Sequence, residues 1–245
     1  MNIKLLHLYP EAMSLYGEYA NLTLLGRYLT WRGAEVEVKA VGCDEAPDFT
    51  GADLIYMGAG TERTQKAALG WLTPYKDALK EAVEGSLVLF TGNAMELLGD
   101  SITDQKGTVY EGLGFGGFAT VETDKRVPHD AIAKTDLFPE PVVGFMNKCS
   151  HTSGVETPIF EAMTMGMGNE KEGGPEGFRH GNVVGTHITG PVLVKNPAFL
   201  AWIAERILFN RGETLPVPAD KPDWLIHAEK AYQVTLEELS ALANK

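Results

Sequence analysis

Cysteine is scarce in this sequence of 245 residues, which contains two, Cys43 and Cys149. Two cysteines cannot build a disulfide framework, and neither stands in the Cys-x-x-Cys spacing of a structural zinc site. The six histidines are scattered without the spacing of metal ligands. We therefore expect no metal site, and nothing in the sequence implies a cofactor.

Long apolar runs and a surplus of basic residues are also absent. No stretch reaches the roughly 18 apolar residues of a membrane span, and the first 20 residues contain no basic segment followed by a long apolar core. Lys and Arg number 21 against 33 Asp and Glu, which gives a net charge of −12. Such a charge repels nucleic acid and anionic lipid. We expect a cytoplasmic protein that neither inserts into a membrane nor binds nucleic acid.

The overall composition is that of an ordinary globular protein, with 44% hydrophobic and 22% charged residues. Residues 1–211 are predicted to form one domain. Three prolines between residues 216 and 222 mark a linker, and a helix over 224–243 follows it. We expect residues 212–245 to pack on the same domain or to serve a partner.

Short apolar runs alternate with segments of helical periodicity along the first half of the chain. The pattern predicts strands at 3–8, 34–41, 53–57 and 87–90, and helices at 20–31, 64–84 and 94–98. Because strands that alternate with helices pair in parallel through right-handed crossovers, we expect an α/β fold with a three-layer, mostly parallel sheet flanked by helices.

The second half of the sequence is richer in predicted strands. Short strands are expected at 142–145, 163–167 and 183–187, and a strongly amphipathic helix at 196–210. Residues 166–179 are polar and rich in glycine, which favours an exposed loop.

Ligands of such sheets bind beyond the carboxyl ends of the strands, here the loops at 58–61 and 91–94. The segment Leu87–Gly99 (LVLFTGNAMELLG) has the order of a nucleophile elbow: an apolar strand, a tight turn of small residues and a helix. An elbow holds one side chain over the edge of the sheet. The turn of this elbow contains no cysteine.

This segment resembles the elbow of class I glutamine amidotransferases of the cobyric acid synthase type, especially the glutaminase subunits of lipid II isoglutaminyl synthases. In those proteins a cysteine precedes two small residues, an aromatic residue and a glutamine. When Gly99 is aligned with the last glycine of the family pattern, Gly92 takes the cysteine position and Glu96 the glutamine position.

Other segments are similar to the same family, in order and at compatible spacing from Ile3 to Arg211. They are Ser14–Val38, which contains a pattern similar to LYxDxGN, and MGAGTERTQ, EGLGFGGFATVETDKR, GFMNKCSHTSG and GNVVGTHITGPVLVKNP. The resemblance implies a flavodoxin-like fold and an oxyanion hole beside the glycine-rich turn 58–60. It also implies that Arg126 lies near the glutamine site, with Asn147 retained and Lys148 in place of a histidine.

The last of these segments resembles the family's GTYLHGPxLxxNP ending, whose catalytic histidine stands directly before Gly-Pro. Thr189 takes that position here, and His187 stands two residues earlier. On a strand these two residues would face the same side, about 6.6 Å apart along the chain. That distance is too long for an unchanged dyad, because a base must lie within about 3 Å of the proton it takes.

The resemblance implies glutamine hydrolysis through a thioester, in which a thiolate attacks the amide and a histidine transfers the proton. Gly92 and Thr189 supply neither group, so we expect a pseudoenzyme without glutaminase activity. Two other nucleophiles are candidates: Cys149 with His151 beside it, and Thr91. The simpler interpretations are a small buried cysteine and a threonine that ends a strand.

Several residues are predicted to bind a ligand if the pocket persists, chiefly through backbone amides at a helix start and through polar side chains. They are Gly58, Ala59, Gly60, Arg63, Asn93, Glu96, Arg126 and Asn147. For Glu96 a simpler interpretation is a carboxylate stabilised at the start of the elbow helix.

Three functions remain open at this point. The chain is a non-hydrolytic subunit that binds and regulates a Mur-ligase-like synthetase in cell-wall synthesis, an amidotransferase or amidohydrolase rewired through Cys149 or Thr91, or a sensor of glutamine or a related small amide or carboxylate.

Overall fold

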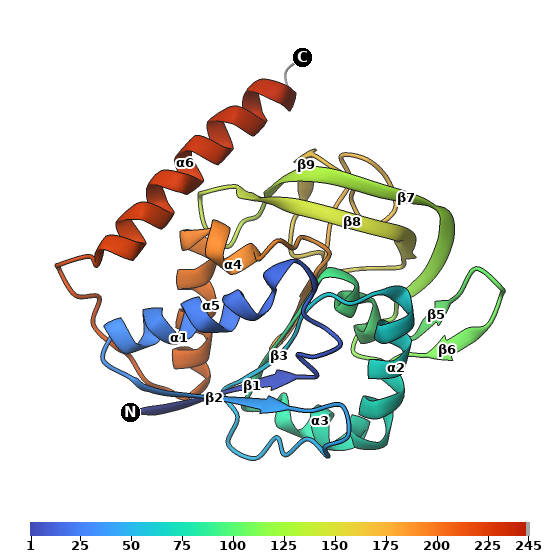
Figure 1. Ribbon diagram of the computed structural model, residues 1–245, viewed down its shortest axis with the longest axis horizontal. Helices are drawn as coiled ribbons and strands as arrows, with labels where there is room; N and C mark the ends of the chain where they lie inside the picture. Colours follow the sequence, from blue (N-terminus) through green and yellow to red (C-terminus); the bar gives the residue numbers. More distant parts are fainter. Residues whose placement is uncertain (244–245) are drawn as a thin grey trace.

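A six-stranded sheet forms the centre of the molecule in the computed structural model, which describes residues 1–243 (Figure 1). The strand order is β10-β11-β4-β3-β1-β2, and all neighbours are parallel except β10 and β11. Its strands are β1 (Asn2–Leu8), β2 (Glu35–Val41), β3 (Leu54–Met57), β4 (Leu87–Thr91), β10 (Phe178–His180) and β11 (Val183–Thr186). The mostly parallel sheet confirms the predicted fold class.

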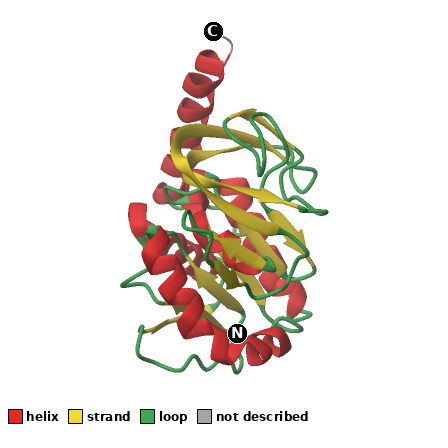
Figure 2. Cartoon of the chain, turned by 90° about the vertical axis from the view of Figure 1, so that its right-hand side faces the viewer, coloured by secondary structure: helices red, strands yellow, loops and turns green. Residues whose placement is uncertain are grey.

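Helices cover both faces of this sheet, as Figures 1 and 2 show. One face carries α1 (Tyr19–Trp31), α4 (Val192–Lys195) and α5 (Pro197–Asn210), and the other carries α2 (Glu62–Leu72) and α3 (Lys76–Ala82). Three short 3-10 helices are η1 (Leu15–Gly17), η2 (Thr73–Tyr75) and η3 (Gly92–Leu98). Because both faces are covered, successive residues of β4 enter different cores: Leu87 and Leu89 enter one, and Val88 and Phe90 the other.

A second, five-stranded sheet lies beyond the carboxyl edge of the first. Its strands are β5 (Ser101–Thr103), β6 (Val109–Glu111), β7 (Ala119–Lys134), β8 (Val142–Ser153) and β9 (Ala162–Met165). The strand predicted at 142–145 was too short, because β8 continues to Ser153 as the antiparallel partner of β7. Polar side chains such as Lys148 and Thr152 point into buried space on this strand and interrupt its apolar pattern.

The helix expected at 94–98 is present, but it is the 3-10 helix η3 and it begins two residues earlier, at Gly92. One local prediction was wrong. The loop expected to be exposed at 166–179 contains two buried polar residues, Asn169 and Glu176. Asn169 exchanges two hydrogen bonds with the backbone of Gly177, and these bonds compensate for its burial.

Residues 212–222 connect α5 to the long helix α6 (Asp223–Ala243) without a helix or strand of their own. The buried Arg32 holds this connection, since its Nε donates to the carbonyl of Pro216 at 2.7 Å. The hydroxyl of Tyr232 in α6 donates to the carbonyl of Pro141 at 2.7 Å. The end of α6 projects beyond the body (Figures 1 and 2). No helix within residues 1–243 has the length and apolar content to cross a membrane.

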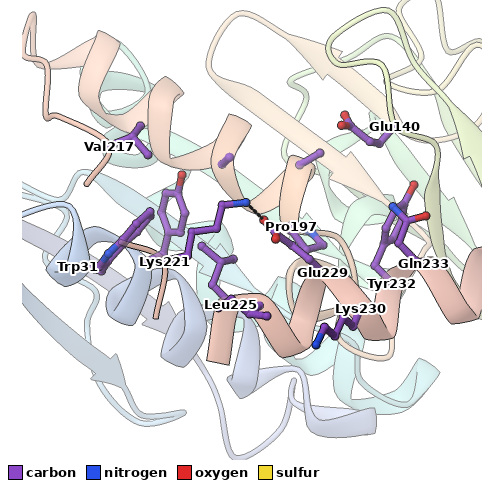
Figure 3. A pocket seen from close by; sticks show the side chains of 14 residues that line it. Trp31, Glu140, Pro197, Val217, Lys221, Leu225, Glu229, Lys230, Tyr232 and Gln233 are labelled. Carbon is purple, nitrogen blue, oxygen red and sulfur yellow. Dashed lines mark hydrogen bonds and ion pairs between the residues drawn. The ribbon is translucent and has the colours of Figure 1, made fainter. Parts of the chain in front are cut away.

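A cavity of about 580 Å³ lies where α6 faces α1 and α5 (Figure 3). Trp31 and Tyr232 line it, and an ion pair of 2.6 Å joins Lys221 to Glu229 at its side. The side chains that line this cavity come mainly from α1, α5 and α6, so the cavity is a gap between packed helices. The cavity lies away from the carboxyl ends of the strands.

The buried His7 makes stability depend on pH. Burial lowers the pKa of its imidazole from 6.5 to about 4, and its ring packs against Tyr56 with centroids 5.2 Å apart. Between pH 6.5 and 4 the unfolded chain binds the proton more readily than the folded chain. The folded state should therefore lose up to about 3 kcal/mol as pH falls through this window. In urea titrations at several pH values, His7→Phe should flatten this dependence; equal slopes for both proteins would contradict the assignment.

Candidate functional site

Three loops meet at the carboxyl edge of the main sheet and enclose a cavity of about 210 Å³. They follow β3, β4 and β11, the arrangement expected of a parallel sheet. The first part of the chain and β7 and β8 complete the walls. The lining residues are Leu15, Tyr16, Ala59, Gly60, Thr61, Glu62, Gly92, Asn93, Arg126, Asn147, Lys148, His187 and Thr189. The structure thus brings Gly92 and Thr189, which the sequence resemblance aligned with a cysteine and a histidine, to one cavity.

Gly92 has the backbone of an elbow without its side chain. Its φ of +62° lies in the left-handed region, which disfavours residues with a Cβ atom. A Cβ atom at this position would lie 2.5 Å from the Cβ of Ala59 and 3.1 Å from its Cα. Ala59 therefore occupies the space into which a nucleophile at position 92 would begin to extend.

The carboxylate of Glu18 lies fully buried beneath this cavity and accepts hydrogen bonds from several elements. Its Oε1 accepts from the hydroxyl of Thr189 and, at 3.0 Å, from the backbone N–H of Gly190. Its Oε2 accepts from the hydroxyl of Thr91 and, at 2.9 Å, from that of Tyr56. These donors compensate for the burial of the charge, which would otherwise cost several kcal/mol.

Neither threonine is available for nucleophilic attack in this arrangement. Thr91 is completely buried, and its hydroxyl also lies 2.9 Å from the hydroxyl of Tyr56. Thr189 lines the cavity, but it donates its hydroxyl hydrogen to Glu18.

His187 is oriented by two buried carboxylates. Its Nδ1 lies 2.9 Å from Oε1 of Glu176, which also accepts from the backbone N–H of His187 at 2.8 Å. Its Nε2 lies 3.4 Å from Oε1 of Glu96, within ion-pair range, but makes no hydrogen bond of good geometry to any described residue.

The expectation that His187 and Thr189 face the same side of a strand was wrong, because β11 ends at Thr186. The hydroxyl of Thr186 accepts from the N–H of Ile188 at 3.0 Å, which turns the chain. Thr189 then forms a bridge with Phe145 of β8, and His187 packs toward Glu96 and Glu176.

Glu96 and Lys148 extend this buried network. Glu96 accepts from Gln65 Nε2 at 2.6 Å and from Ser150 Oγ at 2.5 Å. Burial raises the pKa of Glu96, but the hydrogen bond and charge of His187, with those of Ser150 and Gln65, outweigh burial and hold it below its usual value. Burial lowers the pKa of Lys148, whose ammonium donates to the carbonyls of residues 168 and 169 at 2.8 and 3.0 Å.

The environment of Cys149 does not favour a thiolate. The thiol donates to Glu62 Oε1 at 3.1 Å, and Arg126 Nη2 lies 3.4 Å from the sulfur. Burial, followed by the hydrogen bond and charge of Glu62, raises the pKa of Cys149 to about 12. The partners of the thiol are therefore Glu62 and Arg126. His151, the base considered for Cys149, is exposed, and its Nδ1 lies 3.1 Å from the carbonyl of Glu170.

The predicted ligand-binding residues divide into two groups. Ala59, Gly60, Asn93, Arg126 and Asn147 line the cavity. Arg63 is exposed outside the lining, and Gly58 and Glu96 are buried behind it.

One predicted anion-binding group already has a partner. The backbone N–H of Gly60 donates to Oδ1 of Asn93 at 2.9 Å, so this amide would have to change partner to bind a ligand. In the described chain, no group of three or more His, Cys, Asp or Glu side chains is arranged to hold a metal ion.

Sequence reasoning did not identify Glu18, Glu62, Tyr16 or Glu176 as members of the site. Glu18 occupies the acidic position of the segment similar to LYxDxGN, so a signal for it was present. Tyr16 has a φ of +62°, a strained value for a residue with a side chain, and its hydroxyl accepts from Asn147 Nδ2 at 2.8 Å. Glu176 lies in a segment whose composition is that of a surface loop, and no local signal marks it.

Comparisons with known proteins agree with the motifs. The model of the CobB/CobQ-like glutamine amidotransferase domain matches residues 4–197. The lipid II isoglutaminyl synthase (glutamine-hydrolyzing) subunit GatD of Staphylococcus aureus (strain N315) is 29% identical over 207 residues, 84% of each chain. The subunit of the same name from Streptococcus pneumoniae (strain ATCC BAA-255 / R6) is 28% identical over 223 residues, 89% of this chain and 85% of the relative.

A solved structure described as a glutamine amidotransferase has a similar fold. It superposes with a TM-score of 0.55 at 12% identity, and the match covers 83% of this chain and 98% of that one. At this identity the likeness concerns the fold alone, and it agrees with the flavodoxin-like arrangement expected from the motifs.

Replacement of the Glu18 carboxylate should be strongly destabilising. Glu18→Gln puts an amide N–H₂ among groups that all donate, so we expect a loss of roughly 2–4 kcal/mol in the free energy of unfolding. Chemical denaturation measures this loss. The exposed Glu161→Gln serves as the control and should change stability by less than about 0.5 kcal/mol. Equal effects of the two substitutions would contradict the role of Glu18.

Proposed function

Because this chain belongs to the CobB/CobQ-like glutamine amidotransferase family, we propose that it is a homologue without glutaminase activity that serves as a binding or regulatory subunit of a Mur-ligase-like synthetase. The proposed loss of glutaminase activity rests on one observation. The elbow position is Gly92, and Ala59 fills the space where a nucleophile would start. The proposal includes a cytoplasmic location, where such a synthetase would find its substrates.

The chemistry of glutamine hydrolysis explains why this observation is decisive. A nucleophile must attack the side-chain amide carbon, and a base must take its proton and return it to the leaving ammonia. Gly92 has no atom that can attack. Thr189 has a hydroxyl that already donates to Glu18, and a neutral hydroxyl is not a base. Removal of the nucleophile alone eliminates nearly all catalysis in enzymes of this kind.

The rewired alternatives receive less support. Cys149 would have to lose its proton against a pKa of about 12, and the nearest anion, Glu62, opposes this loss. Arg126 stabilises a thiolate, but its guanidinium is already paired with Glu62 at 2.5 Å. Thr91 is excluded from the cavity by its burial.

The partner is proposed from the relatives. Both carry names that describe them as a subunit of a glutamine-hydrolyzing lipid II isoglutaminyl synthase, and they match along most of this chain. We carry over the subunit role and the class of partner, a synthetase that makes an amide in cell-wall precursors. We do not carry over the hydrolysis step, because the groups that perform it are replaced here.

A second candidate, a sensor of glutamine or a related small amide or carboxylate, is favoured by the cavity that remains. Arg126, Asn147 and Lys148 still line it, and Arg126 is about half exposed. A carboxylate would be attracted to the guanidinium. The two candidates are compatible, since a subunit that binds a ligand can regulate its partner.

Purified protein incubated with glutamine should release no ammonia above the buffer background. Enzyme-coupled ammonia detection measures this, with an active glutaminase as the positive control. Release that disappears in Cys149→Ala would instead support the rewired enzyme. Binding of glutamine without release, weakened at least about tenfold by Arg126→Ala, would support the sensor.

Restoration of the cysteine alone should damage the fold without restoring activity. Gly92→Cys places a Cβ in the left-handed region and against Ala59, so we expect a loss of roughly 2–4 kcal/mol in the free energy of unfolding. Ala59→Gly in the same chain removes the overlap and should recover about 1–3 kcal/mol of it. A double-mutant cycle measures the coupling of the two sites, and a coupling of zero would show that Ala59 does not occupy the nucleophile's space.

The partner itself is tested by affinity purification of the tagged full chain from its native cells. A Mur-ligase-like synthetase should co-purify with the wild-type chain in near-equal amount. Repeated absence of any synthetase would contradict the subunit role while leaving the conclusion on hydrolysis unchanged.

A further inference from the structure

Strand β2 is the outer strand of the main sheet and has one free edge (Figure 1). Among the described residues it pairs with β1 alone. The N–H of Glu35 donates to the carbonyl of Met1 at 2.9 Å, and the carbonyl of Val41 accepts from Tyr9 at 2.8 Å. Backbone groups of parallel strands alternate in direction, so those of the odd-numbered residues face β1. The N–H and C=O groups of the even-numbered residues 36–40 therefore point outward.

The same edge presents apolar side chains to solvent. Val36 and Val38 lie on one face of the strand under Gly26 of α1, where a Cβ would lie 3.6 and 3.9 Å from their methyl groups. Gly26, Trp31 and Trp224 line an open groove of about 650 Å³ beside these two valines. Val38 is 49% exposed. Exposed edges of this kind are templates for pairing with another strand.

The other face of β2 carries opposite charges two residues apart. Glu37 and Lys39 are both exposed, and neither forms an ion pair within residues 1–243. An antiparallel pairing of two copies about a twofold axis at Val38 places Glu37 of each copy opposite Lys39 of the other. The same register sets Val38 against Val38 and Val36 against Ala40. The strand is thus complementary to itself in charge and in apolar character.

We propose that two copies of this chain associate through β2, edge to edge and antiparallel, to form one continuous sheet across a twofold axis. The outward N–H and C=O groups of Val38 bond those of its equivalent, and Val36 exchanges both bonds with Ala40. Glu37 and Lys39 then occupy the non-hydrogen-bonded pairs, where opposite side chains lie closest. The axis stands perpendicular to the sheet, so the two α1 helices and their grooves lie side by side on one face.

The charges of Glu37 and Lys39 favour the pairing centred on Val38 over the pairings centred on either adjacent residue. A shift that centres the axis on Glu37 sets two carboxylates directly against each other, and one centred on Lys39 does the same for two ammonium groups. Like charges opposite one another destabilise a strand pair, whereas the Val38 register contains two attractive pairs by symmetry. Charged side chains protect most edge strands from self-pairing, but here they favour it.

Sedimentation equilibrium on the full chain at 0.1 M salt tests this surface. The wild-type chain should sediment as a monomer–dimer equilibrium. Lys39→Glu replaces two attractive pairs by two repulsive ones and should raise the dissociation constant at least about tenfold. The exposed Lys106→Glu changes the net charge equally at the turn between β5 and β6, and should leave the constant within about twofold.

Two further variants separate pairing at the edge from general effects. Glu37→Lys combined with Lys39→Glu restores complementary charges and should return the constant to within about threefold of the wild-type value. Val38→Pro removes an N–H that points away from β1, so it should abolish the dimer and keep the fold, as circular dichroism can verify. A wild-type chain that stays monomeric to about 100 μM would overturn the proposal. So would a dimer that is insensitive to Lys39→Glu or one that the double charge exchange fails to restore.

Discussion

The buried carboxylate of Glu18 is the interaction on which the site depends. It joins the end of β4 through Thr91, the side of β3 through Tyr56 and the segment after β11 through Thr189 and Gly190. A charge without exposure to water is tolerated only when donors surround it, so these contacts hold one another in place. Strands β3, β4 and β11 end within one residue of the same register beside Glu18. Thr189, one of the donors to Glu18, lines the cavity.

The same network includes one of the two positions that the sequence resemblance aligned with a cysteine and a histidine, Gly92 and Thr189. Here the hydroxyl of Thr189 takes part in a buried network, and Ala59 fills the space beside Gly92. His187 belongs to a second network with Glu96 and Glu176, which joins η3 to the segment before β10. Thr189 and His187 thus have structural contacts, which is compatible with the proposed subunit that binds without hydrolysis.

The parts of the fold that could be predicted are those in which a local pattern has a single physical solution. A strand buried on both faces must be apolar throughout, and β3 and β4 were located from this feature. The second sheet was harder, because β8 places Lys148, Ser150 and Thr152 in buried positions where each has a polar partner. Likewise, the polar segment that contains Glu176 was expected at the surface, since its partner His187 is brought to it only by folding.

The sequence by itself determined the family, the parallel sheet and the identity of the residues at the elbow and before Gly-Pro, because these are properties of local patterns and of single side chains. Only the tertiary structure decided what surrounds those residues. The contacts of Glu18 with Thr91 and Thr189 span 73 and 171 positions of the chain. Such contacts, and the approach of Ala59 to Gly92, arise when the ends of separate strands meet at one edge, and no local pattern of residues specifies them.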